Sequence, residues 1–150
     1  MRIADLCVPD VVQIAPGASV REAAMTMRSQ HVGSLVVTEV ANGRPTPVGI
    51  LTDRDIVLSI VATDAEHLPF LTVSDAMSDD ILTAFEETSL SDALKLMQER
   101  GVRRLPVLDR AGALVGIVTA DDVIRFLAEE LGQVVKLMNH EEQVERRYRV

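Results

Sequence analysis

Two short motifs in this 150-residue chain combine a hydroxyl and a carboxylate at the same spacing. Residues 52–55 are Thr-Asp-Arg-Asp and residues 119–122 are Thr-Ala-Asp-Asp, so both contain Thr-x-x-Asp. The last carboxylate, Asp55 or Asp122, can accept both hydrogens of a vicinal diol, a two-point contact that a hydroxyl cannot match. Each motif begins an expected helix, whose dipole helps to keep the acid ionised and whose free amides can receive a phosphate oxygen.

The same spacing has a second explanation that needs no ligand. A threonine at the N-cap and an acid three residues later form a capping box, in which each side chain accepts a hydrogen bond from the other residue's backbone amide. The two roles are compatible, because a ligand can share or displace the cap. The motif alone therefore leaves both helix capping and ligand binding open.

A pair of arginines, Arg103 and Arg104, precedes the apolar stretch 105–107. Paired guanidinium groups match the geometry of a phosphate better than amines do, so these side chains are candidates for an anion contact. Alternatively, they close the preceding helix, because cations are favoured at a helix C-terminus. The corresponding positions in the first half of the chain are Gly33 and Ser34, and neither is basic.

The elements that must position these residues occur twice. The stretches Gly49-Ile-Leu-Thr52 and Gly116-Ile-Val-Thr119 lie 67 positions apart, whereas residues 3–7, 19–27 and 35–37 match residues 73–77, 89–97 and 105–107 at an offset of 70. The difference falls in residues 39–47, where asparagine, glycine and prolines predict a loop. Either the fold needs these stretches twice, or something binds at them twice.

Each repeat has the element order β-α-β-β-α. The first helix starts after Ser19 or Ser89, each followed three residues later by an acid, Glu22 or Asp92, which is the capping-box spacing. Apolar residues at i, i+3, i+4 and i+7 give both helices one buried face: Val20, Ala23, Ala24 and Met27, and Leu90, Ala93, Leu94 and Met97. We expect strands at 11–15, 34–38, 48–51, 81–85, 105–108 and 114–118, and a second helix from 52–53 and from 119–120.

One such unit of about 60 residues buries too little surface to be stable alone. Its helices cover one face of its sheet, so we expect the two repeats to pack together with pseudo-twofold symmetry. The sequence therefore predicts an α/β fold of the α+β type, with repeat 1 at 1–70, repeat 2 at 71–130 and a C-terminal helical extension at 131–150. This tail carries an apolar stripe and the i,i+4 pairs Glu142/Arg146 and Glu145/Arg149. It is a dimer arm, a partner-docking helix or a frayed tail.

Composition excludes several classes of function. The net charge of −8 disfavours nucleic-acid backbones and anionic membranes, and an aromatic content of 3% argues against a stacking platform for single strands. No apolar run approaches the ~20 residues of a membrane span, and the single Cys7 fits a reducing, cytoplasmic compartment. The three histidines, His31, His67 and His140, have no metal-ligand spacing.

The repeated element order, the two Ser-capped helices, the two Thr-x-x-Asp motifs and the stretch Arg103-Arg-Leu-Pro-Val107 resemble a tandem pair of cystathionine β-synthase-type (CBS) domains, or Bateman module, over roughly residues 1–130. The resemblance implies clefts between the repeats that bind adenosine-type ligands such as AMP, ADP, ATP or S-adenosylmethionine. It implies ribose contacts from Thr52, Asp55, Thr119 and Asp122, with Asp53 and Arg54 in the same motif. It also implies base contacts from about Gln13 and Thr83, and phosphate contacts from Arg103 and Arg104.

We therefore expect a stand-alone, cytoplasmic regulatory module in signal transduction rather than an enzyme. It needs no cofactor, takes an adenosine ligand as regulator, forms a homodimer and acts on an unknown protein partner. The alternative is a ligand-free dimeric interaction scaffold in which Thr-x-x-Asp only caps helices. Because Arg54 in repeat 1 is replaced by Asp121 in repeat 2, we expect the Asp55 cleft to collect Arg54 with Arg103 or Arg104 and to be the stronger phosphate site.

Overall fold

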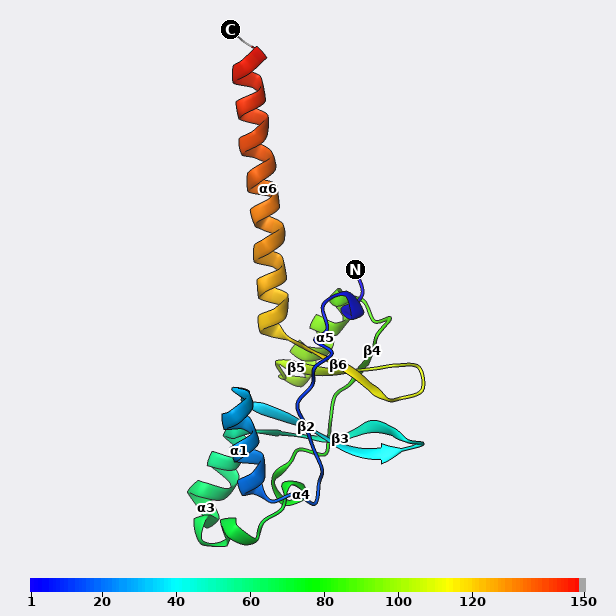
Figure 1. The fold of residues 1–150 in the computed structure, drawn as a ribbon, viewed down its shortest axis with the longest axis vertical. Coiled ribbons are helices and arrows are strands. Elements are labelled where there is room, and N and C mark those ends of the chain that lie inside the picture. Colours follow the sequence, from blue (N-terminus) through cyan, green and yellow to red (C-terminus); the bar gives the residue numbers. More distant parts are fainter. Residues whose placement is uncertain (149–150) are drawn as a thin grey trace.

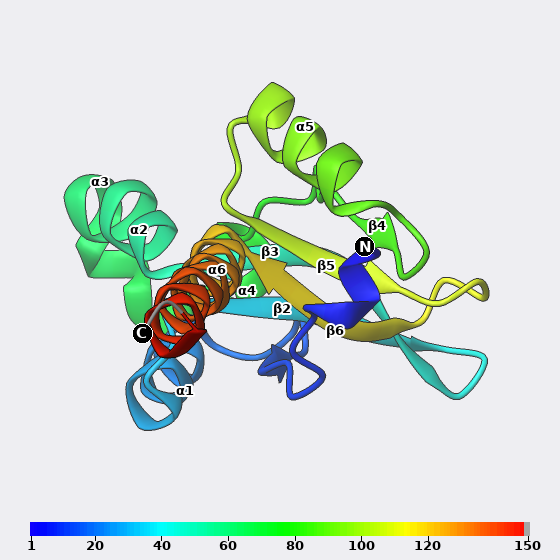
Figure 2. The same cartoon turned by 90° about the horizontal axis from the view of Figure 1, so that it is seen from above.

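The computed structural model describes residues 1–148 and contains two three-stranded sheets, one from each repeat (Figures 1 and 2). Their strand orders are β1-β2-β3 and β4-β5-β6, and in each sheet the first strand is parallel and the third antiparallel to the central one. The two sheets meet along β3 and β6. The predicted class and the repeated β-α-β-β-α order are confirmed.

Repeat 1 contains η1 (Ile3–Asp5), β1 (Gln13–Ile14), α1 (Val20–Gln30), β2 (Ser34–Ala41), β3 (Arg44–Thr52) and the consecutive helical segments α2 (Asp53–Asp55), η2 (Ile56–Val61), α3 (Ala62–Asp64) and η3 (Ala65–Phe70). Repeat 2 contains α4 (Val73–Ala76), β4 (Ala84–Phe85), α5 (Leu90–Arg100), β5 (Arg104–Leu108), β6 (Leu114–Thr119) and α6 (Ala120–Tyr148).

The helices α1 and α5 both begin with a serine N-cap. Ser19 Oγ accepts from the Glu22 amide at 3.1 Å, and Ser89 Oγ accepts from the Asp92 amide at 3.1 Å. In both helices only this half of the predicted capping box is formed, and Asp92 accepts from the Ser89 hydroxyl at 2.7 Å rather than from its amide. The buried faces are narrower than expected, because Ala24 and Leu94 are exposed.

Three elements differ from the prediction, each for a local reason. The segment 39–47 continues the hairpin of β2 and β3, because Asn42 and Gly43 both adopt positive φ (51° and 73°) and make a two-residue turn. The prolines at 45 and 47 are tolerated in β3 because it is an edge strand of its sheet. The strands β1 and β4 have only two residues each, since only these align with the central strand.

The helix after Thr52 is the third difference. It changes from α2 into a π-helical segment, η2, and then into α3 and the 3-10 segment η3. The π segment Ile56–Val61 contains four β-branched aliphatic residues, which crowd an α-helical turn. In repeat 2 the equivalent helix, α6, is α-helical throughout.

The two repeats exchange their leading segments. Ile3 is fully buried in the core of repeat 2, beside residues such as Leu105 and Val118, while Val73 is fully buried in the core of repeat 1, beside Leu35 and Leu51. The N-terminal segment accordingly lies against the second sheet (Figure 2). The two repeats divide at residue 70 in the sequence, but each hydrophobic core includes one segment of the other repeat.

Gly49 and Gly116 mark the points where the exchanged segments cross the sheets. Ser78 forms two backbone hydrogen bonds with Ile50, at 3.0 and 2.9 Å, and Val8 forms two with Ile117, at 2.9 and 3.0 Å. A Cβ on Gly49 would lie 2.9 Å from the Ser78 carbonyl oxygen, and one on Gly116 would lie 2.9 Å from the Cys7 sulfur. The fold therefore needs the Gly-Ile stretch twice, because a side chain at either glycine would meet the crossing segment.

The helix α6 runs for 29 residues and projects away from the sheets (Figure 1). Only Val123, in its first turn, is buried. Gly132 does not interrupt it, and the predicted pair is present, with Arg146 and Glu142 2.6 Å apart. The other predicted pair involves Arg149, which lies outside the described residues. Within residues 1–148, none of the helices combines the length and apolarity of a membrane span.

The crossing predicts the cost of adding a methyl group. Gly49→Ala and Gly116→Ala should each lower the free energy of unfolding by about 1–3 kcal/mol, because overpacking forces a backbone shift. Gly17→Ala is the matched control, since nothing lies within 4 Å of the added Cβ and its φ is not positive. Urea denaturation of the three variants would measure the difference, and a Gly116→Ala protein as stable as wild type would contradict the packing argument.

Candidate functional site

Two clefts of about 430 and 410 Å³ lie between the repeats, within the range of small-molecule sites. Each cleft combines the Thr-x-x-Asp motif of one repeat with the leading segment and a helix-to-strand connection of the other. The Asp55 cleft is lined by residues 50, 52–55, 78, 80–82, 101–104 and 106. The Asp122 cleft is lined by residues 8, 10–12, 31–34, 36, 104, 117, 119, 121, 122 and 125. Most of these positions correspond at the repeat offset, so the clefts are pseudo-twofold counterparts.

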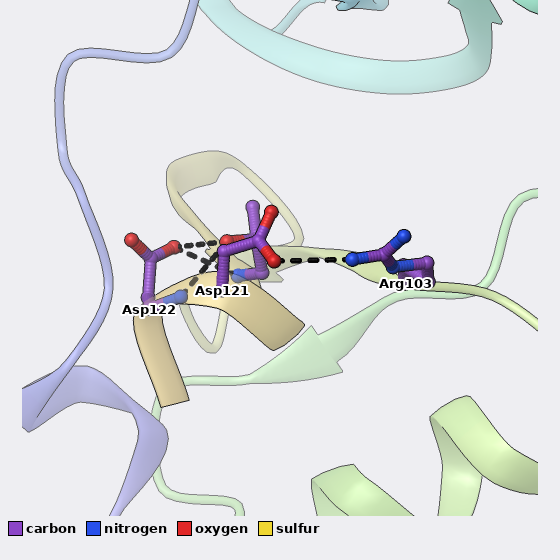
Figure 3. Close-up of polar contacts among 4 residues, drawn as sticks. Arg103, Asp121 and Asp122 are labelled. Atoms are coloured by element: carbon purple, nitrogen blue, oxygen red, sulfur yellow. Dashed lines mark hydrogen bonds and ion pairs between the residues drawn. The ribbon is translucent and has the colours of Figure 1, made fainter. Parts of the chain in front are cut away.

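Each Thr-x-x-Asp motif forms a complete capping box. Asp55 Oδ2 accepts from the amide and from the hydroxyl of Thr52, both at 2.8 Å, and the Asp55 amide donates to Thr52 Oγ1 at 3.1 Å. Asp122 makes the same three bonds with Thr119, at 3.0, 2.6 and 3.2 Å (Figure 3). Because the cap uses Oδ2 in both motifs, the carboxylate is held in a fixed orientation and Oδ1 is the atom that can accept from a ligand.

A third Thr-x-x-Asp, at residues 72–75, shows what the motif does without a cleft. Asp75 Oδ2 accepts from the Thr72 amide and hydroxyl, both at 2.8 Å, as in the other two motifs. The bond from the Thr72 backbone holds the pKa of the Asp75 carboxyl below its ordinary value, and the Thr72 hydroxyl adds to this. Neither residue lines either cleft. Capping therefore accounts for the bonds within the motif, and the surroundings decide whether a ligand can reach the carboxylate.

The backbone amides at the start of α2 are not available as anion donors in this arrangement. The Asp53 amide donates to the Gly33 carbonyl at 3.1 Å, the Arg54 amide to Asp53 Oδ1 at 2.8 Å, and the Asp55 amide to Thr52. The expectation that free amides there receive a phosphate is thus not met, because turn and cap bonds occupy all three. In the Asp55 cleft, donors for an anion must therefore come from side chains.

Arginines supply those donors, mainly in the Asp55 cleft. Arg54, Arg103 and Arg104 all line it, and Arg104 also lines the Asp122 cleft. Arg103 donates to Asp121 Oδ1 at 3.1 Å, which joins a residue of one cleft to a residue of the other (Figure 3). Both side chains of that pair are more than two-thirds exposed, so the pair is weak and an incoming anion can displace it.

The charges of the two clefts differ less than the motifs alone indicate. The Asp55 cleft has three aspartates and three arginines, and the Asp122 cleft has three aspartates, two arginines and His31. Asp121 is paired with Arg103, and Arg125 lies 4.0 Å from Asp122 Oδ1, so part of the expected repulsion is offset. The Asp55 cleft remains the more favourable one for an anion.

The two residues predicted to contact a base, Gln13 and Thr83, do not line either cleft. Gln13 Oε1 accepts from Thr38 Oγ1 at 3.1 Å, and Thr83 immediately precedes β4. The apolar walls come instead from residues just before them, Val11 and Val12 in one cleft and Ile81 and Leu82 in the other. A base-contacting role for Gln13 and Thr83 stays a prediction.

Sequence reasoning missed Asp10 and Asp80, which line the Asp122 and Asp55 clefts respectively. Their separation of 70 positions, equal to the repeat offset, was the available signal. Asp80 also accepts from Arg100 at 2.7 Å. Cys7 lies outside both clefts, and burial raises the pKa of its thiol. Within residues 1–148 no group of three or more His, Cys, Asp or Glu side chains is arranged to hold a metal ion.

Comparison with known proteins identifies the family. The family model described as "CBS domain" matches twice, at residues 3–62 and 73–129, which together are most of the chain. The chain therefore belongs to the CBS-domain family and carries a tandem pair of these domains. The first match ends in the helical segments that follow β3, and the second ends at residue 129, within α6.

Relatives support this assignment. The chain is 32% identical over 142 residues to the CBS domain-containing protein YhcV of Bacillus subtilis, with 93% of this chain and 96% of that protein covered. It is 35% identical over 116 residues to the uncharacterized protein MK0525 of Methanopyrus kandleri, with 77% of this chain but only 57% of that protein covered.

Solved structures have the same fold. CBSX2 in complex with AMP superimposes with a TM-score of 0.71 at 28% identity, covering 85% of this chain and 96% of that one. The CBS domain pair of protein MJ0100, in complex with 5-methylthioadenosine and S-adenosyl-L-methionine, gives a TM-score of 0.74 and covers 87% of this chain and 98% of that one. At 22% identity, the second comparison supports the fold alone.

The cap bonds of Asp75 predict a pH dependence. Its pKa is lowered in the folded state, so it stabilises the fold above its unfolded pKa, near 4, and this contribution is lost as the pH falls through its folded pKa. Asp75→Ala should therefore melt at a lower temperature than wild type at neutral pH, and the difference should shrink below about pH 4. Calorimetry from pH 7 to pH 3 would measure this, with the exposed Asp79→Ala as control. A difference that stays constant across the range would contradict the assignment.

Proposed function

We propose that the chain is a regulatory module that binds an adenosine-type ligand (AMP, ADP, ATP or S-adenosylmethionine) in the clefts between its repeats. The observation that carries this proposal is the pair of clefts in which a capped carboxylate, an apolar wall and arginines converge. CBSX2, 28% identical to this chain, was solved in complex with AMP, which supports the same ligand class here.

The proposed ligand matches the chemistry of each part of a cleft. The base lies against the aliphatic wall formed by residues 81–82 in the Asp55 cleft and 11–12 in the Asp122 cleft. The ribose diol donates to Oδ1 of Asp55 or Asp122, while Oδ2 keeps its bonds to the capping threonine. Since a carboxylate makes stronger hydrogen bonds than a neutral acceptor does, this contact anchors the ligand.

The phosphates of the ligand are the part that distinguishes the clefts. Arg54, Arg103 and Arg104 give the Asp55 cleft three guanidinium groups for a nucleotide tail. The Asp122 cleft has an excess of acids and suits a ligand with less negative charge, such as adenosine or S-adenosylmethionine.

Signalling follows from linkage between the clefts and the arrangement of the repeats. A ligand shifts an equilibrium only if it binds one arrangement better than another. Arg104 lines both clefts and Arg103 is held by Asp121, so an anion that recruits these arginines into one cleft changes the charge of the other. A protein partner then responds to the arrangement. We propose that the chain is not itself an enzyme, requires no cofactor, forms a homodimer and acts in the cytoplasm.

A ligand-free dimeric scaffold is the second candidate, and one observation favours it. In all three Thr-x-x-Asp motifs, including the one outside the clefts, the acid accepts from the threonine amide and hydroxyl, so the motif has a structural role without a ligand. Equilibrium dialysis against AMP, ATP and S-adenosylmethionine separates the candidates, since a scaffold would retain none of them.

The third motif provides a matched test of ribose recognition. Asp55→Ala and Asp122→Ala should each weaken binding of an adenosine ligand in their own cleft by ~1.5–3 kcal/mol, the value of hydrogen bonds to a charged group. Asp75→Ala removes the same kind of cap outside the clefts and should bind like wild type. Isothermal titration calorimetry would measure all three. Wild-type affinity in both cleft variants and in their double mutant would refute the ribose assignment.

The charge difference predicts unequal ligand preferences. In Asp122→Ala, the remaining Asp55 cleft should bind ATP more tightly than adenosine, and added salt should weaken the ATP complex because the attraction is partly screened. In Asp55→Ala, the remaining cleft should show little or no preference for ATP. Titrations with ATP, AMP and adenosine at two salt concentrations would measure this.

Two results would contradict the charge argument. If the tight ATP phase disappears in Asp122→Ala and survives in Asp55→Ala, the clefts are assigned the wrong way round. If both variants bind ATP and adenosine with the same ratio of affinities, the arginines do not determine the preference.

A further inference from the structure

The helix α6 continues for about 19 residues beyond the part of the chain that the family match covers, since the second match ends at residue 129 and the helix ends at Tyr148. Figure 1 shows this segment projecting away from the two sheets. The CBS fold therefore does not account for it, and the clefts do not include it.

An exposed apolar stripe follows one face of α6. Its members recur at alternating spacings of three and four residues, which is the a/d pattern of a two-helix seam. They are Ile124, Leu127, Leu131, Val134 and Met138, exposed by 63, 48, 67, 52 and 63%. Val135, 55% exposed, lies beside this seam. Polar and charged residues such as Glu129, Gln133 and Lys136 lie on other faces.

Such a helix is expected to need a partner. Most helical stability in proteins comes from packing of an amphipathic face rather than from the intrinsic helix propensity of the residues. Gly132 weakens the helix further, near the middle of the stripe. Apolar surface that would stay in contact with water along several turns is typical of an interface.

We propose that the stripe on α6 pairs antiparallel with the same stripe of a second copy of this chain. On pairing, each of these aliphatic side chains would remove on the order of 60–100 Å² of apolar surface from water. The seam and Val135 from two copies thus bury on the order of 1,000 Å² in total, about the lower limit of a specific interface.

The charges at the end of the stripe favour the antiparallel direction. Continuing the a/d pattern past Met138 leads to Glu141 and Glu145. In a parallel pair, each of these acids would face its own copy across the seam, and like charges there are destabilising. In an antiparallel pair centred between Leu131 and Val134, the two copies of each acid lie far apart, and Glu141 lies opposite Ile124 of the partner, beside the exposed cation Arg125.

The proposal goes beyond the proposed ligand binding and does not depend on it. It predicts that the full chain is a dimer whose dissociation constant rises at least 100-fold in Leu131→Glu/Val134→Glu. Gln133→Glu adds a single acid on another face at the same height and should dimerise like wild type. Sedimentation equilibrium over a concentration series gives the constants, and nucleotide titration of the same variants checks that the clefts are unaffected.

The direction is tested in a Cys7→Ser background with single cysteines. A short bismaleimide should cross-link Leu131→Cys, which lies near the centre of the antiparallel pair. It should not cross-link Glu142→Cys, because the two copies of that position would be roughly 30 Å apart at a rise of 1.5 Å per residue. Efficient cross-linking of Glu142→Cys would overturn the antiparallel arrangement.

Two further results would overturn the proposal as a whole. One is a monomeric wild-type chain at high micromolar concentration. The other is a Leu131→Glu/Val134→Glu protein that dimerises as tightly as wild type, which would assign the interface to another face of the CBS pair. Failure of the nucleotide titrations with the dimerisation result intact would count against the proposed function alone.

Discussion

The crossing of two exchanged segments at Gly49 and Gly116 is the constraint on which the rest of the structure depends. Each segment adds backbone hydrogen bonds at the edge strand of the other repeat and buries one aliphatic side chain in its core. Neither repeat therefore has a complete core of its own. This interlocking allows two units, each too small to be stable alone, to form one folded body.

The clefts follow directly from that crossing. Because residues 78–82 leave the edge of β3 and cover the start of α2, the Asp55 cleft has walls from both repeats, and residues 8–12 do the same for the Asp122 cleft. A ligand in either cleft necessarily touches both repeats, so its binding energy can depend on how they are arranged. Thr72 and Asp75 lie in the leading segment of repeat 2, just before it crosses β3. They form a similar cap but line neither cleft, so their motif makes no binding site.

Sequence periodicity predicted what is local, and it could not predict which partner each apolar face would contact. The order of elements, the caps at Ser19 and Ser89 and the two motifs follow from spacing within a few residues. The burial of Ile3 in repeat 2 and of Val73 in repeat 1 depends on contacts between segments distant in sequence, about which periodicity says nothing. For the same reason Asp10 and Asp80 were missed, because they belong to clefts defined by the other repeat.

Duplication alone would give two equal clefts, and the differences between the repeats show where the sequence departs from symmetry. Gly33 and Ser34 correspond to Arg103 and Arg104, and Arg54 corresponds to Asp121. Since each cleft takes its motif from one repeat and its helix-to-strand connection from the other, both substitutions bring positive charge to the Asp55 cleft and remove it from its counterpart. The pair between Arg103 and Asp121 reduces this asymmetry in the absence of an anion. Because both members are exposed, the pair breaks at little energetic cost, so the anion binding that we propose would increase the difference between the clefts.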